Sequence, residues 1–194
     1  MNLDEIRDLI RAEAGIEGDN TYQNLLDAVI NQELSALTGK SKYRELLDWA
    51  PYTIATTAEH LFDLPTNYQL FNSLSFQKSD AETDDFTILQ KGKAPRSGLK
   101  WSGNPVYFYF SASQINVYPF SSIEANDGLV LSYYAKNVLV EDDDELLVPS
   151  LERPLILACV ARMTKMKDTR KGQVIANDAQ QAWLETRTEN AGND

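Results

Sequence analysis

The stretch from residue 103 to residue 137 constrains the fold most, because it reads as three β-strands joined by two turns. Residues 106–110 are wholly apolar or aromatic. Residues 115–118 and 129–135 alternate instead, which places every second side chain on one face of a strand. The two connections contain serine, asparagine, aspartate and glycine, which favour turns. The spacing therefore predicts an antiparallel β-meander in this stretch.

The composition limits what kind of protein this can be. A chain of 194 residues, 43% of them hydrophobic, can bury a full core and predicts one domain. Its 29 acidic and 18 basic residues give a net charge of −11. Lysine and arginine supply the affinity for phosphates, so this charge argues against a protein that attracts nucleic acid. It still allows DNA to pass close by without being bound.

Three local features indicate a soluble intracellular product. The single cysteine, Cys159, excludes an internal disulfide, and its apolar neighbours predict a small buried hydrophobic residue. The N-terminus is acidic where a signal peptide would be basic. The longest apolar run, residues 155–161, is far shorter than the ~20 residues that a membrane span needs.

Apolar residues spaced three and four apart predict helices at the N-terminal end of the chain. The first carries an apolar stripe over residues 3–10, and the second carries one over residues 22–37. A third, short helix is expected to carry the apolar residues between 43 and 49 and to close at Pro51, because proline disfavours helix in the residue before it.

Helices are also predicted at the C-terminal end. After an acidic run at 141–145, a largely apolar helix is expected to begin between Ser150 and Arg153 and to end near Asp168. Gly172 is predicted to separate it from a last helix, and residues 186–194 are expected to form a polar tail.

Between residues 53 and 100 the apolar period changes to two, which predicts strands. We expect a strand pair at 54–57 and 61–64, a strand at 68–77 and a short strand at 86–90. Four basic residues follow, around a proline and a glycine that predict a hairpin tip: Lys91, Lys93, Arg96 and Lys100.

Together these patterns predict an α+β protein, in which N- and C-terminal α-helices form a helical bundle with a central, mostly antiparallel β-sheet or β-barrel-like insertion. The expected divisions are 1–52 for the N-terminal helices, 53–140 for the antiparallel β domain, 141–187 for the C-terminal helices that complete the helical domain, and 188–194 for the polar tail.

The sequence contains no recognisable catalytic motif. Its one histidine, His60, rules out a histidine pair for a metal and is expected to be a solvated residue at a hairpin turn. Nucleotide-binding glycine motifs and the serine nucleophile motif are absent from the sequence. The acidic run at 141–145 lacks the alternating ligands of a calcium loop and is expected to be a solvated connection. We therefore expect no enzymatic activity, no cofactor and no metal.

The order of segments resembles that of the head-to-tail adaptor proteins of tailed phages, also called connector or gatekeeper proteins, the group that includes tail tubular protein A. The resemblance spans roughly residues 3–185, and the order of short motifs carries it. The matching motifs are Ile30-Asn31, Trp49, Thr56-Thr57, Leu64-Pro65, Gly103-Asn104-Pro105 with Tyr107, Ile115 to Pro119, Tyr133-Tyr134, Asp142 to Asp144, Pro149, and the apolar helix at 155–162.

The resemblance implies a virion structural protein of the phage neck, made in the host cytoplasm. Members assemble as a homo-oligomeric ring, commonly twelvefold, beneath the portal protein. The ring extends the DNA channel and provides the platform for the next tail component, a nozzle or stopper protein. An acidic chain suits a wall past which DNA moves without specific binding. No membrane contact is implied.

Two sets of residues are candidate interfaces. The resemblance places the portal contact near the C-terminal end, where the candidates are Lys165, Lys167, Arg170, Lys171, Trp183 and Arg187. The predicted hairpin tip is the candidate surface for the next tail component, through Lys91, Lys93, Arg96 and Lys100.

Other functional classes remain open on the sequence. Another head–tail connector, such as a stopper or tail-completion protein, is the nearest alternative. A carbohydrate-binding β-module could use the aromatic faces of Trp101, Tyr107, Tyr109 and Tyr118. A small hydrolase would need paired carboxylates at strand ends, and the sequence gives no sign of them.

Overall fold

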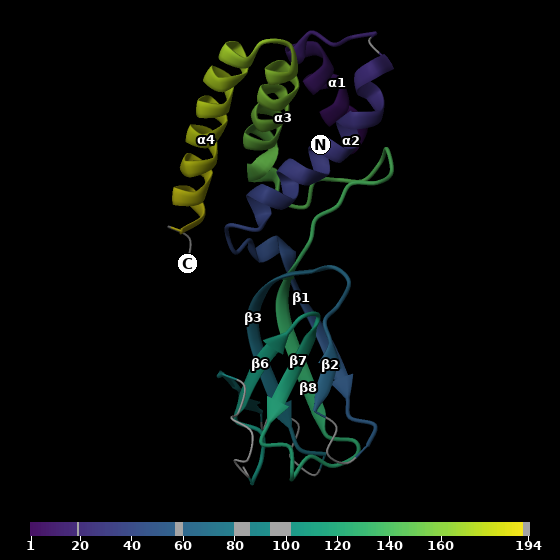
Figure 1. The fold of residues 1–194 in the computed structure, drawn as a ribbon, viewed down its shortest axis with the longest axis vertical. Coiled ribbons are helices and arrows are strands. Elements are labelled where there is room, and N and C mark those ends of the chain that lie inside the picture. Colours follow the sequence, from purple (N-terminus) through teal and green to yellow (C-terminus); the bar gives the residue numbers. More distant parts are fainter. Residues whose placement is uncertain (19, 57–59, 80–85, 94–101, 192–194) are drawn as a thin grey trace. The chain divides into compact units, whose positions relative to one another are not determined.

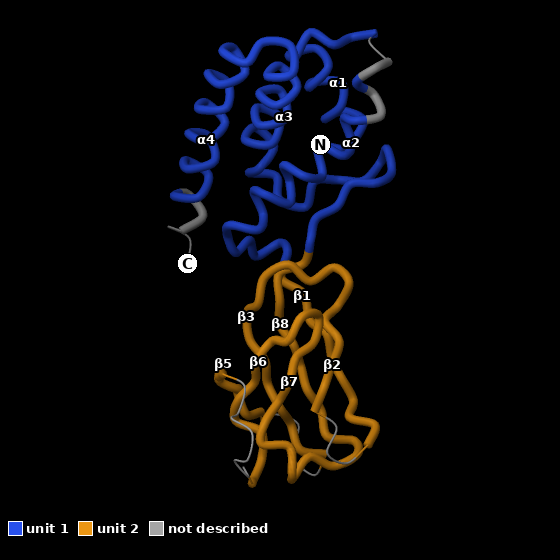
Figure 2. The backbone as a smooth tube through the Cα atoms, in the orientation of Figure 1, with its two compact units in different colours: residues 1–46, 136–194 blue, residues 47–135 orange. Residues whose placement is uncertain are grey.

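The chain forms two compact units, seen here in a computed structural model that describes all residues except 19, 57–59, 80–85, 94–101 and 192–194 (Figure 1). Residues 1–46 and 136–194 form a helical unit, and residues 47–135 form a β unit inserted between them in sequence (Figure 2). The helical unit is therefore assembled from both ends of the chain.

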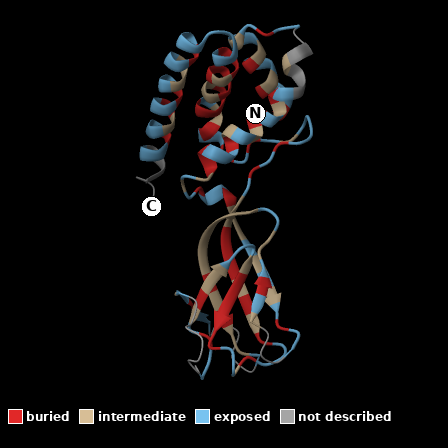
Figure 3. Cartoon of the chain, in the orientation of Figure 1, coloured by how far each residue is buried: buried red, intermediate tan, exposed pale blue. Residues whose placement is uncertain are grey.

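The described part of the helical unit contains four α-helices and two short 3₁₀ helices. They are α1 (Leu3–Ala14), α2 (Asn20–Thr38), η1 (Arg44–Leu46), η2 (Pro149–Leu151), α3 (Glu152–Lys167) and α4 (Thr169–Ala191). Helix α3 is central and packs against α1, α2 and α4. Figure 3 shows α3 largely buried, whereas α4 presents an exposed outer face. The predicted burial of Cys159 is confirmed, since its side chain lies fully buried in α3, where burial raises the pKa of the thiol.

Local sequence signals fix the ends of α1. Asn2 and Glu5 form a reciprocal capping box at its start, and Gly15 ends it with a left-handed φ of 61°. The predicted apolar stripe is buried at Leu3, Ile6 and Ile10. Leu9 is 41% exposed.

The boundary between α3 and α4 lies at Asp168, so the predicted break at Gly172 is wrong. Asp168 has extended backbone angles, and its side chain accepts hydrogen bonds from the backbone N–H groups of Arg170 and Lys171, each at 3.0 Å. Gly172 lies inside α4, where a Cβ atom would come within 2.6 Å of the Cα of Lys165 in α3. Glycine at this position allows the two helices to approach closely rather than ending one of them.

The expected polar tail instead continues α4 as far as Ala191, and residues 192–194 lie outside the described residues. Thr186 is 7% exposed, and its hydroxyl lies 3.2 Å from the carbonyl oxygen of Ser150 and 3.1 Å from that of Ala182. A polar contact that hydropathy does not indicate thus joins helix α4 to η2, just before α3.

Among the described residues of the β unit, eight strands form two four-stranded sheets. The strands are β1 (Leu47–Thr53), β2 (Leu61–Asp63), β3 (Tyr68–Gln77), β4 (Thr87–Ile88), β5 (Gln90–Lys91), β6 (Tyr107–Ser111), β7 (Gln114–Tyr118) and β8 (Gly128–Ala135). Their order is β1-β8-β3-β4 in one sheet and β2-β7-β6-β5 in the other. Neighbours are antiparallel except β5 and β6, which are parallel.

The predicted arrangement of a terminal helical bundle around a single central sheet is wrong. The structure is α+β with four helices and two sheets of antiparallel and mixed strands. The predicted meander is correct for β6 and β7, which pair antiparallel, but β8 joins the other sheet. Phe108 and Val117 from one sheet and Leu131 from the other share a single core. A period of two shows which face of a strand is buried but not which sheet the strand joins.

Two further strand predictions are corrected. Residues 47–53, expected in a helix, form β1, which pairs with β8 from Leu47 opposite Tyr134 onward, so Trp49 lies in a strand. The backbone groups of Ile54 form hydrogen bonds toward the β8 side of β1. Because successive residues of a strand direct these groups to opposite sides, the backbone nitrogen of Pro51 faces the free edge of the sheet. The N–H that proline lacks therefore removes no hydrogen bond between strands. The expected strand pair is also absent among the described residues, because β2 pairs with β7.

We predict that Gly172→Ala destabilises the helical unit. Alanine normally favours helix over glycine, but here the added methyl group would clash with the backbone of α3 and should cost about 1–3 kcal/mol of unfolding free energy. Urea denaturation followed by circular dichroism measures this. The control is the exposed neighbour Gln173→Ala, which should leave stability unchanged. A gain in stability at position 172 would contradict the close packing.

Candidate functional site

A groove of about 630 Å³ lies between α2, α3 and α4 of the helical unit. Small residues form its floor: Ala158 and Ala161 of α3, with Gly172, Ala176 and Ala179 of α4. Spacings of three and four place these residues on one face of each helix, and Trp183 continues the same face of α4. The groove is therefore apolar at its base and closed at one end by an indole ring.

Basic side chains surround this apolar floor. The ammonium group of Lys40 lies 5.4 Å from the ring centroid of Trp183, and the guanidinium of Arg187 lies 5.6 Å from it. Lys165 lines the groove from α3. Arg162 is neutralised by Glu33 across the groove at 2.8 Å. Within the described residues, Lys40, Lys165 and Arg187 form no ion pair, so the rim carries an excess of positive charge on an acidic chain.

Buried polar groups lie beside Trp183. Tyr43 is 2% exposed, and burial raises its pKa, while the neighbouring Trp183 indole and Ser41 hydroxyl favour the ionised form and offset part of the rise. Among the described atoms, Tyr43 Oη, Ser41 Oγ and Trp183 Nε1 form no hydrogen bond of ordinary geometry. These three groups gather beside one another at the end of the groove.

The structure divides the predicted portal-contact residues among three places. Lys165, Trp183 and Arg187 gather at the groove. Lys167 bends away toward α1, where its ammonium donates to the carbonyl oxygen of Gly15 at 3.1 Å and lies 5.3 Å from the ring of Tyr22. Arg170 and Lys171 are exposed in the first turn of α4.

The predicted tail-contact residues are partly visible. Lys91 lies in β5, with its ammonium 5.3 Å from the ring of Phe110. The backbone carbonyl of Lys93 accepts a hydrogen bond from the Tyr118 hydroxyl at 2.7 Å. Arg96 and Lys100 lie outside the described residues.

The tyrosines considered for carbohydrate stacking are already engaged with each other. The rings of Tyr107 and Tyr118 stack at 5.6 Å, and Tyr118 is only 7% exposed. Trp101 lies outside the described residues. His60, expected at a solvated hairpin turn, instead stacks its ring on Phe120 at 4.3 Å, and its carbonyl accepts the N–H of Val117. This arrangement offers little free aromatic surface for a sugar.

The acidic run at 141–145 is a solvent-exposed connection, as expected, and it also forms a hydrogen-bonded turn. Asp144 Oδ2 accepts hydrogen bonds from the N–H groups of Glu141, at 2.8 Å, and Val140, at 2.6 Å, and these bonds lower the pKa of Asp144. Arg7 holds Asp27 through two bonds of 2.7 and 2.8 Å and also contacts Asp142. The sequence gives no signal of this link, because its partners are far apart along the chain.

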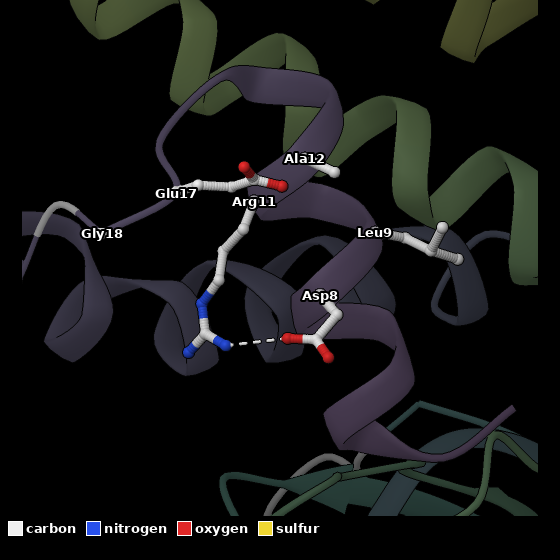
Figure 4. A pocket seen from close by; sticks show the side chains of 6 residues that line it. All are labelled: Asp8, Leu9, Arg11, Ala12, Glu17 and Gly18. Carbon is white, nitrogen blue, oxygen red and sulfur yellow. Dashed lines mark hydrogen bonds and ion pairs between the residues drawn. The ribbon is translucent and has the colours of Figure 1, made fainter.

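A second, shallow pocket lies beside α1 (Figure 4). Its side chains include Asp8 and Arg11, which form an ion pair of 3.0 Å one turn apart, and Glu17. Such an exposed pair is a common helix-surface feature and stabilises little. We assign no function to this pocket.

The described part of the chain has neither a metal-binding cluster nor a helix suited to span a membrane. No group of three or more histidine, cysteine, aspartate or glutamate side chains there is arranged to hold a metal ion. No helix among the described residues combines the length and apolar character of a membrane span.

Comparison with known proteins adds no identification. No protein-family model matches the chain, and a search of curated proteins finds no significant match.

We predict that Asp144→Asn lowers the melting temperature at neutral pH but not in acid. The folded pKa of Asp144 is depressed, so its contribution to stability is present above the unfolded pKa and is lost as pH falls through the folded value. Melting curves of the variant and the parent should therefore converge once the pH falls below the depressed folded pKa of Asp144. The control is Asp143→Asn, which removes an exposed neighbouring carboxylate. A pH-independent difference at position 144 would contradict the assignment.

Proposed function

We propose that this protein is a head-to-tail adaptor of a tailed phage. In this role it binds below the portal as a ring, extends the DNA channel and presents a platform for the next tail component. It acts as a structural protein of the virion neck, without enzymatic activity. The observation that carries the proposal is the order of motifs over roughly residues 3–185, since no single motif is specific by itself.

Several residues of those motifs have defined structural roles, which supports the proposal. Asn31 bonds both backbone groups of Leu139, accepting from its N–H at 2.8 Å and donating to its carbonyl at 2.7 Å. Gly103 has a φ of +111°, a conformation that residues with side chains rarely adopt. The Tyr133 hydroxyl lies 2.9 Å from oxygens of both Asp48 and Asn67. Residues with such structural roles are expected to recur among proteins that share this fold.

The charge distribution also suits an adaptor. A net charge of −11 repels phosphate and favours a channel wall along which DNA moves freely. The exposed basic residues Arg170 and Lys171, at the turn between α3 and α4, provide a local exception. We place the portal contact at this turn, because a positive patch on an acidic protein directs docking to an acidic partner surface.

The deciding experiment is electron microscopy of the purified chain mixed with portal rings of the cognate phage. We expect ring-shaped density attached to one end of the portal. A chain that joins the portal only after another neck protein has bound would be a stopper instead. A chain that never joins the assembly would refute the proposal.

We predict that Arg170→Glu combined with Lys171→Glu weakens portal binding about tenfold or more, since charge reversal opposes docking to an acidic surface. Co-sedimentation with portal rings measures the effect. The control is Arg44→Glu combined with Arg153→Glu, which makes the same change in net charge at exposed positions elsewhere in the helical unit. If both double variants bind the portal equally weakly, the effect comes from overall charge and the portal contact lies elsewhere.

A further inference from the structure

The segment from residue 138 to residue 147 displays both apolar and acidic side chains to solvent. Val138, Val140 and Leu147 are 51%, 70% and 54% exposed. The exposed acidic residues of the same segment are Glu141, Asp142, Asp143 and Glu145. The segment therefore offers aliphatic and acidic side chains together to a partner surface.

We propose that this segment of one copy docks in the groove between α2, α3 and α4 of a second copy. The inference rests on the proposed function, because it specifies the contact that would join neighbouring subunits of the adaptor ring. It also assigns Lys165, Trp183 and Arg187 to the contact between copies and leaves Arg170 and Lys171 to the portal.

The two surfaces match in chemistry. The groove has an alanine-rich floor that can receive aliphatic side chains such as Val140. Its rim carries Lys40, Lys165 and Arg187 without acidic partners among the described residues, opposite the carboxylates of the docking segment. Charge pairs of this kind set orientation and exclude wrong partners, while the apolar centre supplies affinity.

The segment is also held in a fixed conformation before it binds. Its backbone is bonded to α2 through Asn31 and Leu139, and the N–H of Leu146 donates to the carbonyl oxygen of Met1 at 3.1 Å. Asp144 closes the turn between these two anchors. Little chain entropy is therefore lost on docking, which favours binding even by a short segment.

The positions of the two surfaces exclude docking within one copy. In Figure 1 helix α4 forms one margin of the helical unit, and the loop that contains residues 141–145 projects at the opposite margin. A contact between two different surfaces of identical chains is head-to-tail, and repeated copies of it close into a ring or extend into a filament. This is the symmetry that an adaptor ring requires.

Complementary charge reversal tests this contact. One variant reverses the groove with Lys40→Glu and Lys165→Glu, and the other reverses the segment with Glu141→Lys and Asp143→Lys. Sedimentation velocity at low ionic strength, where charge pairs are screened least, measures association. We expect the parent chain to associate with rising concentration and each variant to associate at least about tenfold more weakly.

The decisive sample is an equimolar mixture of the two variants. Neither variant can dock on a copy of itself, but each segment matches the groove of the other variant, so the mixture should associate in alternating order. A chain that carries all four changes should associate again. A parent chain that stays monomeric up to about 100 µM, or a mixture that gives no dimer, would overturn the proposal.

Disulfide trapping guards against variants that fold poorly. A chain with Gln180→Cys at the groove, mixed with a chain with Asp143→Cys in the segment, should form a crosslinked dimer on oxidation, because the native Cys159 is buried. Ala12→Cys, exposed on α1, replaces Gln180→Cys in the control and should not crosslink; equal crosslinking in the control would also overturn the contact. If the chain binds the portal but the contact between copies is absent, the proposed adaptor function still holds. If the contact between copies forms but the chain does not bind the portal, only the adaptor function is refuted.

Discussion

The helical unit depends on hydrogen bonds between the two ends of the chain, which the whole β unit separates in sequence. Asn31 and Leu139 are 108 positions apart, and Arg7 and Asp142 are 135 apart. Closing so long a loop costs conformational entropy, although the cost grows only slowly with length. The β unit reduces this cost when it folds, because β1 and β8 pair with Leu47 opposite Tyr134 and so bring its two ends side by side.

The same bonds determine the conformation of the segment after the β unit. Residues 138–147 would be a free connection if Asn31, Met1 and Asp144 did not fix the backbone. Arg7 adds a charged contact to Asp142, and Asp27 stabilises that guanidinium and raises its pKa. The exposed side chains of the segment are consequently displayed from a rigid base, which is the property that a docking surface needs.

The groove depends on a different constraint, the close approach of α3 and α4 at Gly172. Because a side chain there would meet the backbone at Lys165, the two helices lie close enough for small residues to form a continuous floor. Tyr43 and Ser41 then lie beside Trp183 at the end of the groove, near Lys40 and Arg187. A concentration of cations on an acidic chain thus arises from three segments: the residues after α2, helix α3 and helix α4.

The sequence alone determined the features that depend on neighbours along the chain. The stripe of Leu3, Ile6 and Ile10, the burial of Cys159 and the β6–β7 hairpin follow from local periodicity and turn residues, and each was predictable. The tertiary structure alone decided that residues 47–53 form a strand, that β8 joins the second sheet, and that Gly172 packs against α3. It also decided which basic residues share the groove and which remain at the α3–α4 turn. These outcomes depend on partners that lie tens of residues or more away in the sequence. A local pattern indicates which face of an element is buried, but it does not indicate which other element packs against that face.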